Sequence, residues 1–403
     1  MKADIATVID RAENPSLLEP LRLAGGSPYR AELTELAVEL TAQSTGFRRS
    51  LPDGVVSALA DLVRAMNCYY SNLIEGHNTH PIDIERAMRK DYSRGPHKRN
   101  LQLEARAHVS VQQWIDAGGL KGRTASSDGI GEIHRRLCEL LPDALLWIED
   151  PDSGTRVRVD PGELRNRDVR VGAHVPVSPG AVPRFLARFE DVYGRLGRAE
   201  LIVSAAAAHH RLLWIHPFLH GNGRVARLMS HAMLLEALDS GGIWSIARGL
   251  ARQERSYKDQ LAACDQPRQG ELDGRCNLSE KALVDFTHFF LEVCIDQVRF
   301  MESLVQPSRL RDRILIWAEE EIRSGELPAK AGFVLEAVLF RGKLSRGDVA
   351  ALLGMGERQA RRVTSALLEA GVVTSESTRA PLKIAFPATL AGRWLPGLFP
   401  EAA

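Results

Sequence analysis

The chain has 403 residues, a length that exceeds one typical hydrophobic core and predicts two or three domains. Hydrophobic residues make up 44% and charged residues 26%, as in ordinary soluble globular proteins, and the net charge of +1 indicates no class of partner. No apolar run reaches the roughly 18 residues of a membrane span, and no signal pattern opens the chain, so we expect no membrane association. Five scattered cysteines without a Cys-x-x-Cys pair predict reduced thiols in the cytoplasm.

The N-terminal part, up to about residue 124, has mostly helical patterns. The strongest is a helix that follows Pro52, because its apolar residues recur at i, i+3, i+4 and i+7. This helix should end at Gly76, a natural stop. Ser71 and Glu75 are four residues apart and therefore share one face near its end. Taken alone, this pattern is that of a helix end with a solvated glutamate.

A helix over residues 128–141 should follow. His134 lies on its apolar face, where it is expected to pack in the core rather than bind a ligand. Residues 147–183 then break the helical pattern. Valines alternate with charged residues at 157–159 and again at 169–171, and glycines and prolines punctuate the segment. This alternation predicts a β-hairpin.

The segment His216 to Arg227, His-Pro-Phe-Leu-His-Gly-Asn-Gly-Arg-Val-Ala-Arg, carries the chemical signal of the chain. The Ala-rich run 201–215 predicts a buried helix that ends before the proline, because proline cannot sit inside a helix. Gly221 and Gly223 permit a turn with positive φ, and a second helix should start near Arg224. Backbone N–H groups in such a loop, at the positive end of the next helix, form a cradle for phosphates.

Three side chains of this segment suit phosphate-ester transfer. Arg224 and Arg227 lie one helical turn apart, and the planar guanidinium group binds phosphate oxygens. His216, at the mouth of the loop, can take a proton near neutral pH. The alternatives are a plain helix–loop–helix corner, or a zinc site built from nearby histidines. His216 and His220 have the spacing of zinc helices, but the proline and glycines between them argue against a helix.

The segment resembles the signature of the Fic (Fido) family, H-P-F-x-(D/E)-G-N-G-R-x-x-R, at every position except that of the acidic residue, where His220 stands. Most members transfer AMP from ATP to a Ser, Thr or Tyr hydroxyl of a target protein, so the resemblance implies this activity and ATP as the substrate. The acidic residue normally binds Mg²⁺. Because an imidazole suits softer divalent ions better than Mg²⁺, we expect weak Mg²⁺-supported activity or a preference for another divalent cation.

The same resemblance implies a role for each matching residue. His216 would be the general base, and Asn222 would help to hold the reacting phosphate. The β and γ phosphates would contact Arg224 and Arg227. The remaining nucleotide-binding positions of the loop are Gly221 and Gly223.

Two other segments resemble known parts of Fic proteins. Ser71-x-x-x-Glu75-Gly76 is similar to the motif (S/T)-x-x-x-E-(G/N) of an inhibitory helix, here at about residues 55–76. Glu75 would then pair with Arg227 and occupy the place of the γ-phosphate. The hairpin expected within 147–183 resembles the flap that docks a target segment by strand pairing.

After the motif, a helical stretch at 243–265 has two interpretations. By the resemblance, some of its side chains border a nucleotide base, and by pattern alone they are ordinary helix surface. The side chains in question are Arg248, Gln253 and Tyr257. Residues 277–321 should form one or two long helices that extend the core.

The region from Pro328 onward changes character. It predicts a helix, a helix–turn–helix and then two short strands, which is the order of a winged helix. The second helix of the helix–turn–helix presents Arg358, Arg361 and Arg362. Ten Lys and Arg against six Asp and Glu leave a charge of +4, which is mild for a DNA-binding domain. DNA binding and protein contact both stay open.

We therefore expect a mainly α protein with a Fic helical core and a β-hairpin flap. The leading function is protein adenylylation restrained by Glu75, with a target protein docked on the flap. The alternatives are a diverged Fic enzyme that uses another donor or removes AMP, and a DNA-binding regulator with a weakened core. A homodimer is left open. The expected segments are an N-terminal helical region (1–124), the Fic core (125–270), a helical extension (271–327) and a winged helix (328–403).

Overall fold

The computed structural model describes residues 8–149 and 154–400, and the chain is mainly α-helical, as predicted. Among the helices of these residues, none combines the length and the continuous apolarity that crossing a bilayer requires. The helices are α1 (Arg30–Arg49), α2 (Asp53–Ile74), α3 (Pro81–Met88), α4 (Pro96–Asp116), α5 (Ser127–Glu139), α6 (Val182–Tyr193), α7 (Arg198–Ile215), α8 (Asn222–Ala237), α9 (Ile246–Arg252), α10 (Glu254–Cys264), α11 (Glu280–Leu304), α12 (Pro307–Ser324), α13 (Ala331–Arg341), α14 (Asp348–Leu353), α15 (Glu357–Glu369) and α16 (Ala391–Trp394). The strands are β1 (Trp147–Glu149), β2 (Arg156–Arg158), β3 (Val373–Thr374) and β4 (Lys383–Ile384).

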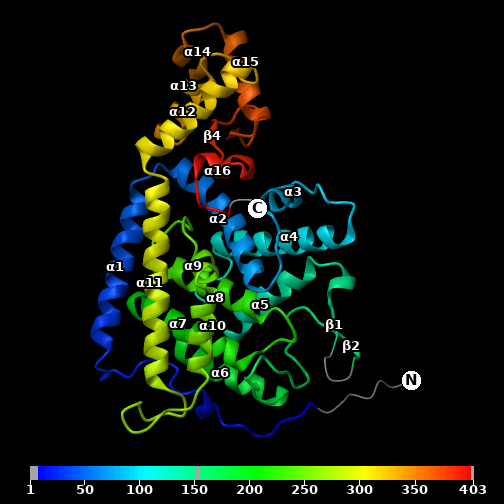
Figure 1. Cartoon of the computed structure of the whole chain (residues 1–403), viewed down its shortest axis with the longest axis vertical. Coiled ribbons are helices and arrows are strands. Elements are labelled where there is room, and N and C mark those ends of the chain that lie inside the picture. The colour runs from blue at the N-terminus through cyan, green and yellow to red at the C-terminus, as the bar shows by residue number, and fades with distance from the viewer. Residues whose placement is uncertain (1–7, 150–153, 401–403) are drawn as a thin grey trace.

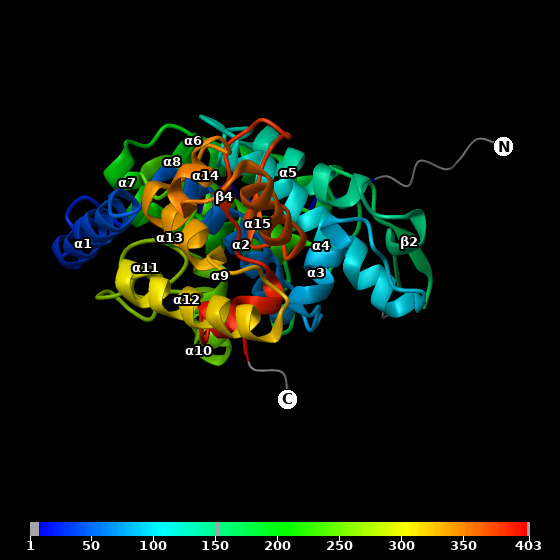
Figure 2. The same ribbon diagram turned by 90° about the horizontal axis from the view of Figure 1, so that it is seen from above.

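Helices α1 to α11 build the body of the molecule, and α12 to α15 with β3 and β4 form a lobe at one end (Figure 1). The long α11 packs beside α1 along one side of the body. Helix α2 contacts α4, α8 and α9 in the body and also β4 and α13 in the lobe, and the view from above shows the lobe over α2 (Figure 2). One hydrophobic core continues from Leu18 to Leu398, and the four-segment division of the chain stays a prediction.

Helices α7 and α8 form the centre of the body, and the motif loop joins them. The buried alanines of α7, residues 205–208, have small side chains that allow α8 to approach closely. Polar groups also cross this interface, since His209 Nδ1 hydrogen-bonds Ser230 Oγ at 2.9 Å. The loop between the two helices is therefore held on a well-packed base.

A β-hairpin forms in the predicted region, but with a different pair of strands. β1 and β2 are antiparallel, with Trp147 opposite Arg158 and Glu149 opposite Arg156. The expected strand at 169–171 is wrong, because Gly172, at φ 59°, turns the chain back and Val171 bridges only His174.

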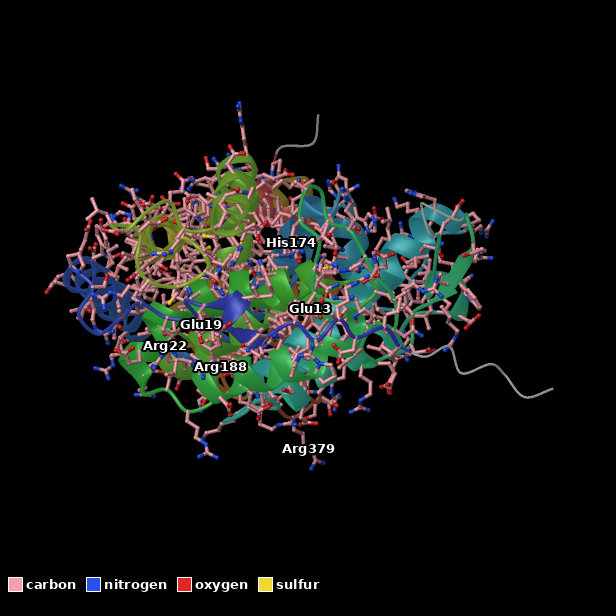
Figure 3. The ribbon with its side chains drawn as sticks, turned by 90° about the horizontal axis from the view of Figure 1, so that it is seen from below. Glu13, Glu19, Arg22, His174, Arg188 and Arg379 are labelled. Atoms are coloured by element: carbon pink, nitrogen blue, oxygen red, sulfur yellow. The ribbon has the colours of Figure 1, made fainter. Side chains whose placement is uncertain are left out.

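The segment before α1 runs across the lower face of the body, where Glu19 lies near Arg188 (Figure 3). The carboxylate of Glu13 accepts a hydrogen bond from the N–H of Ser178 at 2.7 Å. Arg188 Nη2 pairs with Glu19 at 2.5 Å, and Arg184 pairs with Asp10 at 2.6 Å. These contacts hold the N-terminal segment against α6 and the residues just before it.

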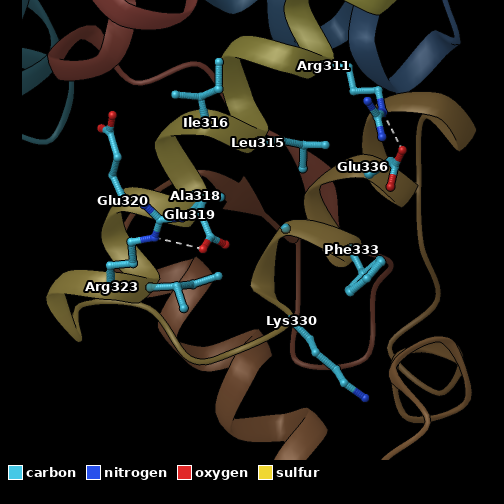
Figure 4. A pocket seen from close by; sticks show the side chains of 12 residues that line it. Arg311, Leu315, Ile316, Ala318, Glu319, Glu320, Arg323, Lys330, Phe333 and Glu336 are labelled. Atoms are coloured by element: carbon cyan, nitrogen blue, oxygen red, sulfur yellow. Dashed lines mark hydrogen bonds and ion pairs between the residues drawn. The ribbon is translucent and has the colours of Figure 1, made fainter.

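The elements of the lobe follow the order predicted from the sequence, with α13, α14 and α15 before the hairpin of β3 and β4. Leu344 and Leu382 add a further antiparallel bridge. The assignment as a winged helix stays a prediction. A cavity of about 600 Å³ lies between α12 and α13, lined in part by Leu315 and Phe333 (Figure 4). It belongs to the lobe and not to the motif loop.

Candidate active site

The loop between α7 and α8 follows the pattern of its glycines and proline. Helix α7 ends at Ile215, and His216 takes the left-handed conformation at φ 51° and ψ 62°. This conformation is uncommon for a residue with a Cβ atom and persists where the surroundings fix it. Gly221 has φ 83°, and α8 begins directly after it at Asn222, two residues before the predicted start. The first turn of α8 is thus part of the loop site.

Arg165 fixes the backbone at the head of this loop, a role that no pattern in the sequence indicates. Its Nε donates to the carbonyl of His216 at 2.7 Å, and its backbone N–H donates to the carbonyl of Pro217 at 2.9 Å. Burial lowers the pKa of Arg165 to about 10, so the guanidinium stays charged at neutral pH. Arg165 therefore accounts for the unusual conformation of His216.

The imidazole of His216 is held in its neutral form. Burial, reinforced by the charge of Arg165, lowers the pKa of His216 to about 4. The side chain is consequently neutral at pH 7, which is the form that a general base requires.

Asn222 braces the loop. Its Oδ1 accepts from the backbone N–H of Phe218 at 3.0 Å, and its Nδ2 donates to the carbonyl of Phe218 at 2.8 Å. Both polar atoms of the side chain are thus engaged with one residue across the turn. Asn222 thus fixes the backbone of the turn at Phe218.

Arg227 is held by the end of α2. Its Nη2 lies 2.5 Å from Oε1 of Glu75, and it also donates to the hydroxyl of Ser71 at 2.8 Å through Nε and to the Ser71 carbonyl at 3.1 Å. Burial opposes the ionisation of Glu75, but Arg227 outweighs it through charge and hydrogen bonding and lowers the pKa of Glu75. The structure therefore brings together Ser71, Glu75 and Arg227, with Gly223 beside them.

Arg224 is held on its other side. Its Nη2 donates to Nε2 of His220 at 2.9 Å, and its Nη1 lies 3.5 Å from Oε2 of Glu104 on α4. The same Glu104 oxygen lies 2.8 Å from Nδ1 of His77. Burial lowers the pKa of His220, and the positive charge of Arg224 lowers it further, so the neutral imidazole is favoured. Sequence reasoning missed Glu104 and His77, because their distance along the chain from Arg224 hides the contact.

His134 packs against the loop, as expected for a packed histidine. Its ring stacks on Phe218 with 3.9 Å between centroids and 3° between planes. Nδ1 accepts from the N–H of Gly162 at 2.9 Å, so Nε2 carries the proton and donates to the carbonyl of His220 at 3.2 Å. Burial lowers the pKa of His134 to about 4, which keeps this arrangement neutral.

The other histidines near the motif each have a different partner, so they do not converge on one point. His209 hydrogen-bonds Ser230 and Tyr257, His210 pairs with Asp265 at 2.9 Å, and His231 pairs with Asp116 at 2.7 Å. Over residues 8–149 and 154–400, no group of three or more His, Cys, Asp or Glu side chains gathers as a metal site would require. The geometry therefore gives the zinc interpretation no support.

Two of the three residues expected near a nucleotide base, Arg248 and Tyr257, have protein partners in this structure. Arg248 is buried, donates to the carbonyl of Gly397 at 2.9 Å and to Oε1 of Gln297 at 3.0 Å, and stacks on Phe300. Tyr257 is buried and hydrogen-bonds His209 at 2.7 Å, whereas Gln253 is exposed. Arg248 thus anchors the C-terminal segment in this state.

Comparisons with known proteins agree with this geometry. The family model of the Fic/DOC family matches residues 124–234. The protein adenylyltransferase Fic of Drosophila willistoni is 35% identical over 129 residues, which are 32% of this chain and 23% of that protein, and that of Drosophila yakuba is 42% identical over 129 residues with the same coverage. The match thus spans less than a quarter of these relatives.

The likeness in structure extends further than the likeness in sequence. A crystal structure of a Fic family protein from Desulfovibrio desulfuricans G20 superposes with a TM-score of 0.54 and 16% identity, and it covers 90% of this chain and 98% of that one. At that identity the superposition speaks for the fold alone. The family match places a Fic/DOC domain at residues 124–234, and the superposition agrees with that fold.

Proposed function

We propose that this protein is an adenylyltransferase that moves AMP from ATP to a hydroxyl group of a target protein. The observation that carries the proposal is the loop of residues 216–227, where a neutral His216 stands at the mouth and two buried arginines lie one turn apart on α8. The relatives that match this part of the chain are named protein adenylyltransferases. ATP is the substrate implied by that name.

In the proposed reaction, the hydroxyl oxygen of the target attacks the α-phosphorus of ATP. His216 accepts the hydroxyl proton at a nitrogen of its neutral imidazole. Pyrophosphate leaves as the new phosphate ester forms, so AMP stays on the target and no oxidant or reductant is needed. Arg224 and Arg227 stabilise the charge that develops on the leaving phosphates, and the N-terminus of α8 adds its backbone N–H groups. Asn222 keeps the loop in the shape that this requires.

Glu75 restrains this reaction in our proposal. Its carboxylate occupies the guanidinium of Arg227, which would otherwise contact the last phosphate of ATP. This charge-assisted contact reaches Arg227 in the interior, where only 3% of the Arg227 side chain is exposed, whereas 35% of the Glu75 side chain faces solvent. ATP must therefore displace Glu75 to bind in the productive way.

The hairpin of β1 and β2 is the proposed docking element for the target. It presents Trp147, which is exposed and lies under the guanidinium of Arg156 at 5.6 Å from the ring centroid. An added strand would pair with the backbone of this hairpin, so recognition of the target sequence would be loose.

The residues of the loop do not fit Mg²⁺ in this state. Position 220 offers an imidazole nitrogen that already accepts a hydrogen bond from Arg224, whereas Mg²⁺ prefers oxygen ligands. In the proposed reaction Arg224 and Arg227 therefore supply the positive charge that faces the phosphates.

ATP labelled in different phosphates tests the proposal directly. The full chain with Glu75→Gly should incorporate label from the α-phosphate and none from the γ-phosphate. Incorporation from the γ-phosphate would indicate a kinase instead, and a nucleotide other than ATP as the better donor would favour the diverged enzyme.

A second candidate function is DNA binding by the lobe. It rests on three arginines that are exposed together on α15, namely Arg358, Arg361 and Arg362. A gel-shift assay with the full chain tests it.

A further inference from the structure

The first arginine of the motif, Arg224, is paired with a carboxylate that lies outside the segment matched by the family model. Oε2 of Glu104 lies 3.5 Å from Nη1 of Arg224, and both side chains are shielded, with 12% and 9% of their surfaces exposed. Nη2 of the same guanidinium donates to His220. Both terminal nitrogens of the Arg224 guanidinium thus have a protein partner in the absence of a nucleotide.

Glu104 is also tied to the segment that carries Glu75. Its Oε2 lies 2.8 Å from Nδ1 of His77, and the backbone N–H of His77 donates to the carbonyl of Asn72 at 2.8 Å, which closes the end of α2. One turn further back, Cys68 of α2 lies 3.5 Å from the carbonyl of Ala105, the neighbour of Glu104. The positions of Glu104 and of the end of α2 are therefore coupled.

We propose that Glu104 is a second restraint, which holds Arg224 as Glu75 holds Arg227, with His77 joining both restraints to the end of α2. The inference rests on the proposed function, in which the two arginines bind the phosphates beyond the first. Arg224 and Arg227 are both buried cations, and each has one carboxylate beside it. Charge is thus balanced without a nucleotide, and the carboxylates repel the phosphates that would replace them.

The space around this contact supports competition. A cavity of about 20 Å³ is lined in part by Glu104, His220 and Arg224, and its size corresponds to about one water molecule. A phosphate group needs more room, so Arg224 must part from Glu104 to bind one. The carboxylate therefore affects ligands with a β-phosphate and leaves AMP unaffected.

The proposal is tested by measuring the affinity of the full chain for ADP and for AMP by calorimetric titration. EDTA is present so that no divalent cation takes part. Glu104→Gln keeps the shape of the side chain and removes its charge, and we expect ADP to bind about threefold to tenfold more tightly while AMP changes less than twofold. Glu139→Gln, an exposed carboxylate on α5 that pairs with Arg135, is the matched control and should change neither affinity. Glu104→Asp draws the charge back by one methylene and should act in the same direction, which keeps the test open if the Gln variant fails to fold.

A double-mutant cycle assigns the effect to Arg224. Arg224→Ala should weaken ADP binding, and adding Glu104→Gln to it should change nothing further. An unchanged or weaker affinity for ADP in Glu104→Gln, or a gain that survives in Arg224→Ala, would overturn the inference alone. If Arg224→Ala and Arg227→Ala both leave ADP binding intact, the proposed function fails with it.

Discussion

A Cβ atom on Gly223 would stand 2.3 Å from Oε1 of Glu75, so the absence of a side chain at Gly223 permits the close approach of the Glu75 carboxylate. The approach brings the Glu75 carboxylate over the first turn of α8 and onto Arg227. The N-terminus of a helix favours negative charge, whether it belongs to a carboxylate or to a phosphate. Glu75 and a nucleotide phosphate therefore compete for one place.

Removal of the Glu75 carboxylate should raise activity. In Glu75→Gly the guanidinium of Arg227 becomes free for a phosphate, and we expect more self-labelling than in the original chain at equal ATP. Glu75→Gln, which keeps the shape without the charge, should act in the same direction, and Glu139→Gln serves as the control. Equal or lower labelling in a folded Glu75→Gly protein counts against the restraint.

The replacement of His220 by Asp should increase the response to Mg²⁺. The change supplies an oxygen ligand where the imidazole offers a nitrogen that is already engaged with Arg224. We expect the initial labelling rate of Glu75→Gly/His220→Asp to exceed that of Glu75→Gly severalfold with Mg²⁺, and by less with Mn²⁺. His97→Asp, on the exposed start of α4, adds the same charge away from the loop. No gain with Mg²⁺ would show that residue 220 does not stand at a metal position.

Buried neutral histidines should make the fold sensitive to acid. Burial is the first cause that lowers the pKa of His108 and His209 to about 3 and of His134, His210 and His216 to about 4, from 6.5. The unfolded chain binds more protons than the native one between these values. The free energy of unfolding should then fall as the pH drops below 6.5, by up to about 1.4 kcal/mol per histidine and pH unit.

The carboxylate of Glu75 contributes in a separate window. Because Arg227 lowers its pKa below 4.5, the stability that it adds is present above that pH and is lost only below it. Melting temperatures at pH 7.5 and pH 5.5 therefore report the histidines, and the value at pH 5.5 should be lower. Equal melting temperatures would mean that these histidines are not held neutral.

The exposed arginines of α15 should govern any binding of DNA. Arg361→Ala/Arg362→Ala should weaken binding and reduce the slope of log affinity against log salt by up to about 2, since each phosphate contact contributes about 0.9. Arg255→Ala/Lys258→Ala removes the same charge from exposed positions on α10 and is the control. If the original chain binds no DNA at low salt, this role is excluded.

Features that depend on neighbouring residues could be predicted from the sequence, whereas contacts between distant residues could not. The loop of residues 216–227 could be read from the sequence because its proline, glycines and arginines act on neighbours within a few residues. The contacts of Arg165 with His216 and of Glu104 with Arg224 join residues that are far apart along the chain, so no sequence spacing predicts them. The strand expected at 169–171 failed for a related reason, because alternation indicates a strand without naming its partner, and β2 pairs with β1 instead.

In the proposed reaction, His216 starts the transfer of AMP by accepting the hydroxyl proton. In the Glu75→Gly background, His216→Ala should lower the rate of transfer by about two to four orders of magnitude, the range for loss of a general base. The most direct measurement is the intact mass of Glu75→Gly and of Glu75→Gly/His216→Ala after equal incubation with ATP. We expect an added AMP group on the first protein and essentially none on the second. An equal gain of mass on both proteins would contradict it.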